Sequence, residues 1–301
     1  MIDLRRLSVL RAVAHYGTVT AAAEAVHLTP SAASQQIRQL SKELDVALLE
    51  RHGRRVRLTP AARGLLRHAD RIAEYWQEAE AELHTAHPTA LRGHVRLAGF
   101  PTAVCSLLAP LAAQLRAEGP DLTVELRQAE PGECFDLLFS GDADLAVVEA
   151  TTDSPPLNDA RFHQRPLMDD AFDLLTPADH PLATGPAPKL GELADEPWIL
   201  AAPPCSARQL VLAACTSAGF TPAIAHQVSE WSVVATLVAH GLGIALVPRV
   251  VQLPPQLNLA RTPLDGEVRP FRRLLRVVRS GDERHPTIAA AASRLDALAP
   301  R

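Results

Sequence analysis

The sequence predicts an α/β protein with a helix-rich N-terminal head, a long linker helix and a two-lobed α/β body. Residues 1–58 contain three helical patterns followed by a basic hairpin, which together indicate a winged helix-turn-helix. A heptad pattern then runs to Pro88. Beyond it, strand and helix patterns alternate, which predicts a parallel sheet with helical crossovers.

Length and composition are those of a globular chain of about two domains. The 301 residues are 47% hydrophobic and 21% charged, which excludes disordered and fibrous proteins. No uncharged apolar run reaches the ~18 residues of a membrane span, and the N-terminus lacks the apolar region of a signal peptide. We therefore expect a cytoplasmic protein whose four cysteines are reduced.

Charge is distributed unevenly along the chain. Residues 1–60 carry 9 basic and 5 acidic side chains, whereas residues 89–301 carry 18 and 24. A positive head on a negative body favours a polyanion as the partner of the head. Ordinary scatter remains an alternative, because the chain has 28 Arg and only 2 Lys and G/C-rich codons can explain that bias.

Three helices are expected in the head. Apolar residues at helical spacing over residues 4–14 predict the first helix, which Gly17 ends. A threonine then opens a second, alanine-rich helix over residues 18–26, whose small side chains allow a close helix–helix approach. Thr29 fits the N-cap of a third helix over residues 30–44, which has a proline at its first position.

The third helix has two different faces. One is a narrow apolar stripe made of Ala33, Ile37, Leu40 and Leu44. The other bears short polar groups and then cations, with no acid before Glu43. Because a DNA major groove admits one helix and arginine can bind guanine there, this face is a candidate for reading bases. Its candidate DNA-binding residues are Thr29, Ser31, Ser34, Gln35, Arg38 and Lys42. A solvated face on a small three-helix core is the alternative.

A basic hairpin follows the third helix. Apolar and basic residues alternate over residues 48–58 around a glycine-containing turn, which predicts a two-stranded wing. Arg54 and Arg55 are the wing residues expected to contact the phosphates of a duplex, with Arg51 and Arg57 beside them. A solvated arginine hairpin is the alternative.

Residues 59–88 predict one helix roughly 40 Å long. Its apolar residues are spaced 4, 3, 4, 3, 4, as in a coiled coil. They are Leu65, Ala69, Ile72, Trp76, Ala79 and Leu83. Since a lone amphipathic helix has no core of its own, this seam predicts a homodimer whose two heads read two half-sites. Packing of the seam onto the chain's own body is the alternative.

The body is expected to begin with a strand over residues 93–99 and a helix over residues 107–115. The further expected strands are 122–126, 145–148, 198–201, 223–228, 244–247 and 274–278, and the further expected helices are 134–139, 206–218, 231–240 and one from about residue 287. Because this alternation occurs twice, we expect two lobes, with a ligand bound at the carboxyl ends of the strands or between the lobes.

These patterns resemble the LysR-type transcriptional regulators over essentially the whole chain. Residues 21–40, AAAEAVHLTPSAASQQIRQL, resemble that family's helix-turn-helix, and residues 55–64, RVRLTPAARG, its wing and linker start. In the body the resemblance lies at residues 143–147, 180–182 and 238–248. The family often has Glu, Gly and Phe where this chain has Ser41, Asp45 and Leu49.

The resemblance implies a DNA-binding domain (1–58), a dimerising linker helix (59–88) and an effector-binding domain (89–301). Lobe I is then expected at about 91–161 and 268–301, and lobe II at about 162–267. It also implies a small-molecule effector, changes in promoter binding or bending, and homodimers or homotetramers.

The effector site carried over from the family lies at three strand ends. Its residues are Phe100, Pro101, Thr102, Pro204, Cys205, Ser206 and Trp231. Because the family often has Ser or Thr where Phe100 or Pro101 stands, this site favours an apolar or aromatic effector. The alternatives are that Thr102 and Ser206 only cap helices and that Trp231 belongs to the core.

The sequence contains no hydrolase, phosphate-loop, zinc or redox motif, so we expect no catalytic residues, metal or cofactor. Gly241 and Gly243 fit a helix end and a tight strand entry better than a phosphate loop. His84 and His87 fit charge compensation at a helix end. The ten-residue spacing of Cys205 and Cys215 resembles the peroxide-sensing branch of the family, but the surrounding residues do not match and Cys215 falls at an apolar helix position, so a redox pair is the less favoured interpretation. Two functions compete with a regulator: a solute-binding or enzymatic α/β protein with an N-terminal interaction module, and a scaffold built on the long helix.

Overall fold

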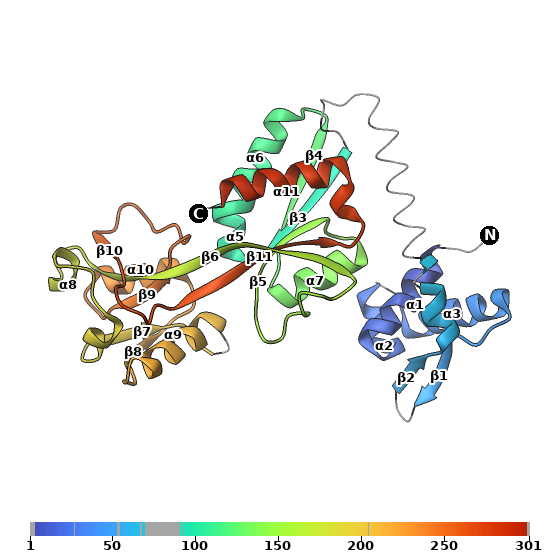
Figure 1. Ribbon diagram of the computed structural model, residues 1–301, viewed down its shortest axis with the longest axis horizontal. Coiled ribbons are helices and arrows are strands. Elements are labelled where there is room, and N and C mark those ends of the chain that lie inside the picture. Colours follow the sequence, from blue (N-terminus) through green and yellow to red (C-terminus); the bar gives the residue numbers. More distant parts are fainter. Residues whose placement is uncertain are drawn as a thin grey trace.

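The computed structural model describes residues 4–26, 28–52, 55–66, 68–69, 91, 93–203 and 205–299 (Figure 1). The head consists of α1 (Leu4–Tyr16), α2 (Val19–Ala25), α3 (Pro30–Leu44), β1 (Leu49–His52) and β2 (Arg55–Leu58). Residues 60–66 and 68–69 then begin a further helix. The predicted winged helix-turn-helix is confirmed. No helix among the described residues has both the length and the apolar character needed to cross a bilayer.

The ends of the head helices follow from single residues. Gly17 takes a positive φ of 69° after α1, and the Thr18 hydroxyl accepts the backbone N–H of Ala21 at the start of α2. Thr29 caps α3 by accepting the N–H of Ala32. Asp45, where the family often has glycine, takes the left-handed conformation with φ 53°. Aspartate tolerates the left-handed region better than most residues, so Asp45 can end α3 in the conformation for which glycine is otherwise favoured.

The head core confirms the predicted apolar stripe. Ala33, Ile37 and Leu40 of α3 are buried, and Leu44 packs against the same cluster. Ala22 and Ala23 of α2 are fully buried, which fits the close helix–helix approach that the alanines predicted. The apolar face of α3 is therefore packed into the head core, and its opposite face is left exposed to solvent.

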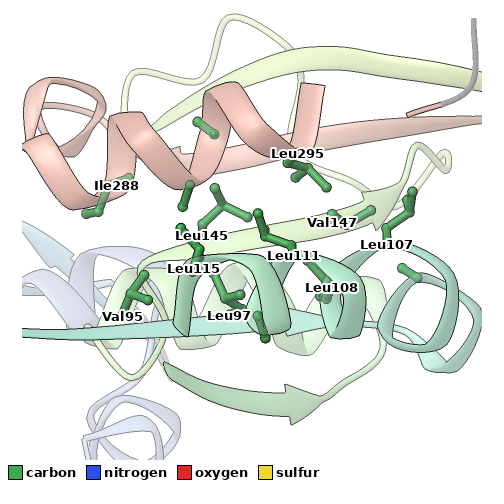
Figure 2. Packing of buried hydrophobic residues seen from close by; sticks show 14 of the residues in the cluster. Val95, Leu97, Leu107, Leu108, Leu111, Leu115, Leu145, Val147, Ile288 and Leu295 are labelled. Atoms are coloured by element: carbon green, nitrogen blue, oxygen red, sulfur yellow. The ribbon is translucent and has the colours of Figure 1, made fainter. Parts of the chain in front are cut away.

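Lobe I of the body is a sheet between helices. Its elements are β3 (Gly93–Gly99), α5 (Pro101–Ala103), η1 (Val104–Leu108), α6 (Ala109–Glu118), β4 (Leu122–Gln128), α7 (Pro131–Ser140), β5 (Leu145–Glu149), η3 (Asp282–Arg284) and α11 (Pro286–Leu298). β3 pairs in parallel with β4 and β5. Leu145 and Val147 face the cluster under α6 and α11 (Figure 2), whereas Ala146 and Val148 face the cluster under α7.

Lobe II has its own two core clusters. Its elements are α8 (Pro181–Thr184), η2 (Leu190–Leu193), β7 (Pro197–Leu200), α9 (Ser206–Ser217), β8 (Ala223–Gln227), α10 (Trp231–Ala239), β9 (Ala245–Pro248) and β10 (Leu259–Pro263). β7 and β8 pair in parallel, as the alternation predicted. Trp198 is fully buried and its indole N–H donates to the carbonyl of Leu193, 3.1 Å away.

Two long strands connect the lobes and correct the expectation of a purely parallel sheet. β6 (Phe162–Pro177) pairs antiparallel with β11 (Phe271–Arg279) through its first part and with β9 and β10 through its last part. The sheet is therefore mixed. The sequence pattern missed β6 and β10. In the middle of β6, RPLMDD, apolar and charged residues do not alternate.

Head and body also touch directly in this chain. The Tyr16 hydroxyl at the end of α1 donates to Oδ1 of Asp136 on α7, 2.7 Å away. Phe139 of α7 packs against the apolar cluster of the head. Burial and the neighbouring carboxylate raise the pKa of Tyr16 above its ordinary value, so this phenol keeps its proton and stays a donor.

The glycine pair after α10 tests the tight-turn interpretation. Gly241 follows the end of α10 with φ 69°, and Gly243 enters the strand region with φ 146°, where a Cβ would lie 2.6 Å from the carbonyl oxygen of Pro197. The interpretation as a helix end and a tight strand entry is confirmed.

We predict that Gly243→Ala lowers the stability of the effector domain by about 1–3 kcal/mol, measured by thermal unfolding. Gly132→Ala, which meets no atom within 4 Å in the first turn of α7, is the control and should leave stability unchanged or slightly raised. Equal melting temperatures for both variants would contradict the interpretation.

Candidate nucleic-acid interface and effector site

The polar face of α3 is open to solvent. Ser31, Gln35, Arg38 and Lys42 are exposed and Ser34 is half-buried. Within the described part of the chain, the side chains of Arg38 and Lys42 form no ion pair. Glu43, the first acid of the helix, is bound by Arg6 of α1 and by Gln39. The face therefore presents hydrogen-bonding groups and unneutralised cations, which suits a major groove.

Thr29 lies at the edge of this face. Its hydroxyl caps α3 and lies 3.0 Å from the Ser31 hydroxyl, so the two side chains form a small polar group at the start of the helix. Backbone N–H groups at such a helix start favour a phosphate. The capping role accounts for Thr29 structurally, and its DNA contact stays a prediction.

The wing forms as a hairpin, with His52 opposite Arg55 and Glu50 opposite Arg57. Arg57 is exposed. Arg54 and the side chain of Arg55 lie outside the described residues, so their phosphate contacts stay predictions. The described strands confirm the wing that would carry them.

The predicted dimer seam is described only at its start. Ala69 is buried and Leu65 is half-buried, and both pack against the head core. The remaining seam residues, Ile72, Trp76, Ala79 and Leu83, lie outside the described residues, as do His84 and His87. The first turns of this helix thus join the head to the linker, and dimerisation stays a prediction.

The first strand end of the effector site lies in lobe I. Phe100 is the N-cap residue of the helix that follows β3, with Pro101 exposed and Thr102 buried behind it. The helix contains a π-helical stretch, η1, a feature frequent near functional sites. Within it, the Ser106 hydroxyl donates to the carbonyl of Val250 in lobe II, which links the lobes.

The other two strand ends lie in lobe II. Cys205, and not Ser206, is the N-cap of α9, so the alternative that Ser206 caps this helix is wrong. Trp231 begins α10 and packs against both lobe II clusters, which supports a core role for much of its side chain. The loops before α9 and α10 lie together, since Ala202 donates its N–H to the Ser229 hydroxyl. Pro204 lies outside the described residues.

Charged residues that the sequence analysis missed join these strand ends. Arg272 of β11 stacks over the ring of Phe100, with its guanidinium carbon 5.0 Å from the ring centre. Glu149, the last residue of β5, lies close enough to the Ser206 hydroxyl of lobe II that Ser206 lowers the pKa of its carboxyl. Asp170 of β6 binds Arg272 directly. The position of Glu149 at the carboxyl end of a predicted strand was the one signal that pointed to it.

The fold and the exposed helix face define the class: a winged helix-turn-helix DNA-binding regulator with a two-lobed ligand-binding body. Residues 4–63 match the bacterial regulatory helix-turn-helix proteins of the lysR family, and residues 88–299 match the LysR substrate binding domain. The chain therefore belongs to the LysR family of transcriptional regulators.

Named relatives agree with this assignment. The chain is 30% identical to the transcriptional dual regulator GltC of Bacillus subtilis, over 82% of this chain and 81% of that protein. It is 31% identical to a RuBisCO operon transcriptional regulator of Allochromatium vinosum, over 82% and 79%. These relatives are named as regulators and not as enzymes, which favours the regulator over the enzymatic alternative.

Solved structures share the fold. An OxyR mutant of Corynebacterium glutamicum matches with a TM-score of 0.60 and 26% identity, over 98% of this chain and 92% of that one. A full-length OxyR from Pseudomonas aeruginosa matches with a TM-score of 0.63, over 99% and 98% of the two chains, but at 24% identity it supports the fold alone.

Burial of Glu149 predicts a pH effect on stability. Burial raises the pKa of Glu149, with Arg272 partly opposing the shift and Asp170 and Glu130 adding to it. The folded state therefore keeps this proton to higher pH than the unfolded state does, so its contribution is fully present at acidic pH and falls as pH rises through the folded pKa. We predict that the melting temperature of the parent, relative to Glu149→Gln, falls between acidic and neutral pH. The exposed Glu267→Gln control should show no such trend. A difference that grows with pH would contradict the prediction.

The cysteines should react at different rates. Burial raises the pKa of Cys134 to about 12 and that of Cys215 to about 11, whereas Cys105 is exposed. Because the thiolate is the reactive form, we predict that iodoacetamide labels Cys105 first and Cys134 and Cys215 last, measured by peptide mass spectrometry. Rapid labelling of Cys215 would contradict this and would favour a redox role.

Proposed function

We propose that this regulator binds promoter DNA as a homodimer or homotetramer and senses a small molecule at the junction of its two lobes. The observation that carries the DNA contact is the polar face of α3, which is exposed and bears cations that form no ion pair among the described residues, while Glu43, the one acid of the helix, is bound by Arg6. A protein of this kind acts in the cytoplasm, where the promoter is.

Within the proposed complex, α3 lies in the major groove. Ser31, Ser34, Gln35 and Arg38 read base edges, and Thr29 lies at the N-terminal end of the helix. Lys42 and the wing residues Arg54 and Arg55 bind phosphates, which gives affinity without sequence preference. The seam from Leu65 to Leu83 pairs two chains and sets the spacing between their heads.

Effector binding is proposed at the three strand ends carried over from the family. Phe100, Pro101 and Trp231 supply apolar surface, with Thr102, Cys205, Ser206 and Pro204 beside them. Ligand contacts to both lobes shift their relative angle, and the linker helices convert that angle into head spacing and DNA bending. The apolar residues support an apolar or aromatic part in the effector.

Gel-shift assays test the proposal directly. DNA upstream of the chain's own gene and of its neighbours is titrated with the full chain, with and without candidate metabolites. We expect a specific shift that a metabolite changes. A protein that ignores every such fragment at low salt would overturn the proposal.

Two arginine substitutions separate base reading from phosphate binding. We predict that Arg38→Ala costs ~1–3 kcal/mol on the specific site and relaxes sequence preference, if Arg38 contacts guanine. Arg54→Ala should weaken all DNA alike and reduce the slope of affinity against salt by about 1. Arg116→Ala, which removes an exposed cation from lobe I, is the control. If Arg38→Ala and Arg54→Ala both bound DNA with the affinity of the parent, as the control should, the assignment of base reading to Arg38 and phosphate binding to Arg54 would be wrong.

A further inference from the structure

Three buried charged side chains meet where the lobes join. Asp170 on β6 and Arg272 on β11 are cross-strand partners, with Nε of Arg272 2.9 Å from Oδ2 of Asp170. Oε2 of Glu149 lies 3.9 Å from Nη1 of Arg272. Asp170 is 0% exposed, and Glu149 and Arg272 are each 5% exposed. Because buried charges are costly unless every polar atom is satisfied, the partners of each atom in this cluster matter.

One nitrogen of the cluster has no partner. Nη2 of Arg272 is buried and makes no hydrogen bond within the described part of the chain. The guanidinium stacks on the ring of Phe100, which supplies no acceptor for this nitrogen. Buried ionised donors are rarely left unsatisfied in native proteins. A ligand that brought an acceptor to Nη2 would remove this cost.

Glu149 also has capacity for a further partner. The Ser206 hydroxyl lies close enough to lower the pKa of its carboxyl, and its contact with Arg272 is longer than a hydrogen bond. Asp170, by contrast, is occupied by Nε of Arg272 and by the backbone N–H of Val250, 3.1 Å away. Glu149 is therefore the acid of this cluster that is open to a ligand.

The charges of the cluster select the kind of ligand. With both acids ionised, one arginine faces two carboxylates, and the sum is −1. A simple anion would satisfy Nη2 but add to the negative excess, and a simple cation would leave Nη2 unpaired. A zwitterion satisfies both requirements, because its acceptor pairs with Arg272 and its positive group offsets Glu149.

We propose that the effector is an α-amino acid with an apolar side chain, whose carboxylate binds Nη2 of Arg272 and whose ammonium group binds Glu149. This inference rests on the proposed function, since it names the ligand class of the same interlobe site. The two recognition groups are neighbours, as a carboxylate and an amine on one carbon require. The apolar side chain lies against Phe100 and Pro101, and Ser206 joins the polar end to lobe II.

Calorimetric titration of the full-length protein tests the ligand class. L-Leucine, L-methionine, L-phenylalanine and L-tryptophan are titrated, together with 3-phenylpropanoate and 2-phenylethylamine, which each lack one charged group of phenylalanine; matched pairs are made for the other three. We expect at least one amino acid to bind, and both of its single-charge analogues to bind about tenfold or more weakly. Equal binding of an analogue, or no binding of any of the four at millimolar concentration, would overturn the proposal.

Substitutions of Glu149 and Arg272 test which residue binds the ammonium group of the ligand and which binds its carboxylate. Glu149→Gln keeps shape and an acceptor for Ser206, so it should weaken the amino acid and leave its carboxylate analogue unchanged. Arg272→Lys should weaken both ligands. The exposed neighbour Arg273→Lys and Glu267→Gln are the matched controls and should change neither. Unchanged amino-acid binding in Glu149→Gln would refute the role of Glu149. If a variant fails to fold, the comparison of ligands on the unmodified protein still decides the ligand class.

The same preparation is tested on promoter DNA, which separates the two proposals. A protein that binds DNA but none of the amino acids refutes the amino-acid effector and leaves the regulator intact. A protein that binds no promoter DNA refutes the proposed function, whatever the calorimetry gives.

Discussion

The antiparallel pairing of β6 with β11 is the constraint on which the body depends. Both lobe cores are built around these strands, because β11 also pairs with β5 in lobe I and β6 continues into lobe II to pair with β9 and β10. The ion pair of Asp170 and Arg272 lies across this ladder at the point where the lobes separate. This buried pair lies across one rung of the ladder, so the residues at the lobe junction are held in place from both strands.

The head was predicted almost completely because its signals are local. Thr18, Gly17 and Thr29 act on backbone groups within a few residues, and the stripe from Ala33 to Leu44 follows from the helical period. The body was predicted less well because its strands depend on pairing with residues that are distant in the sequence. β6 contains Asp169 and Asp170, whose charges break any alternation and are bound by arginines about a hundred positions away.

The difference between local signals and long-range pairing also explains which residues of the candidate effector site were predicted and which were missed. Phe100, Thr102 and Ser206 were found through a family pattern at predicted strand ends, and the structure places Phe100 and Ser206 beside one charged cluster. Arg272 was missed because the expected strand began only at residue 274, whereas β11 begins at Phe271. Nothing in its neighbours along the chain shows that Asp170 lies opposite it. Only tertiary pairing turns this arginine from a surface residue into a buried donor.

Whether the arginine-rich composition indicates nucleic-acid binding depends on which arginines form ion pairs within the chain. In the body, Arg96, Arg249, Arg273 and Arg276 each bind an aspartate, so these arginines add paired charge there and little net field. On α3, Arg38 and Lys42 form no ion pair with any described residue, and Glu43, the one acid of the helix, is held by Arg6. Counting arginines therefore gives no evidence of nucleic-acid binding in this chain, whereas the two cations on the acid-free face of α3 do. The physical signal of DNA recognition is the absence of carboxylates from one helix face, because an internal carboxylate would compete with phosphate for the same cations.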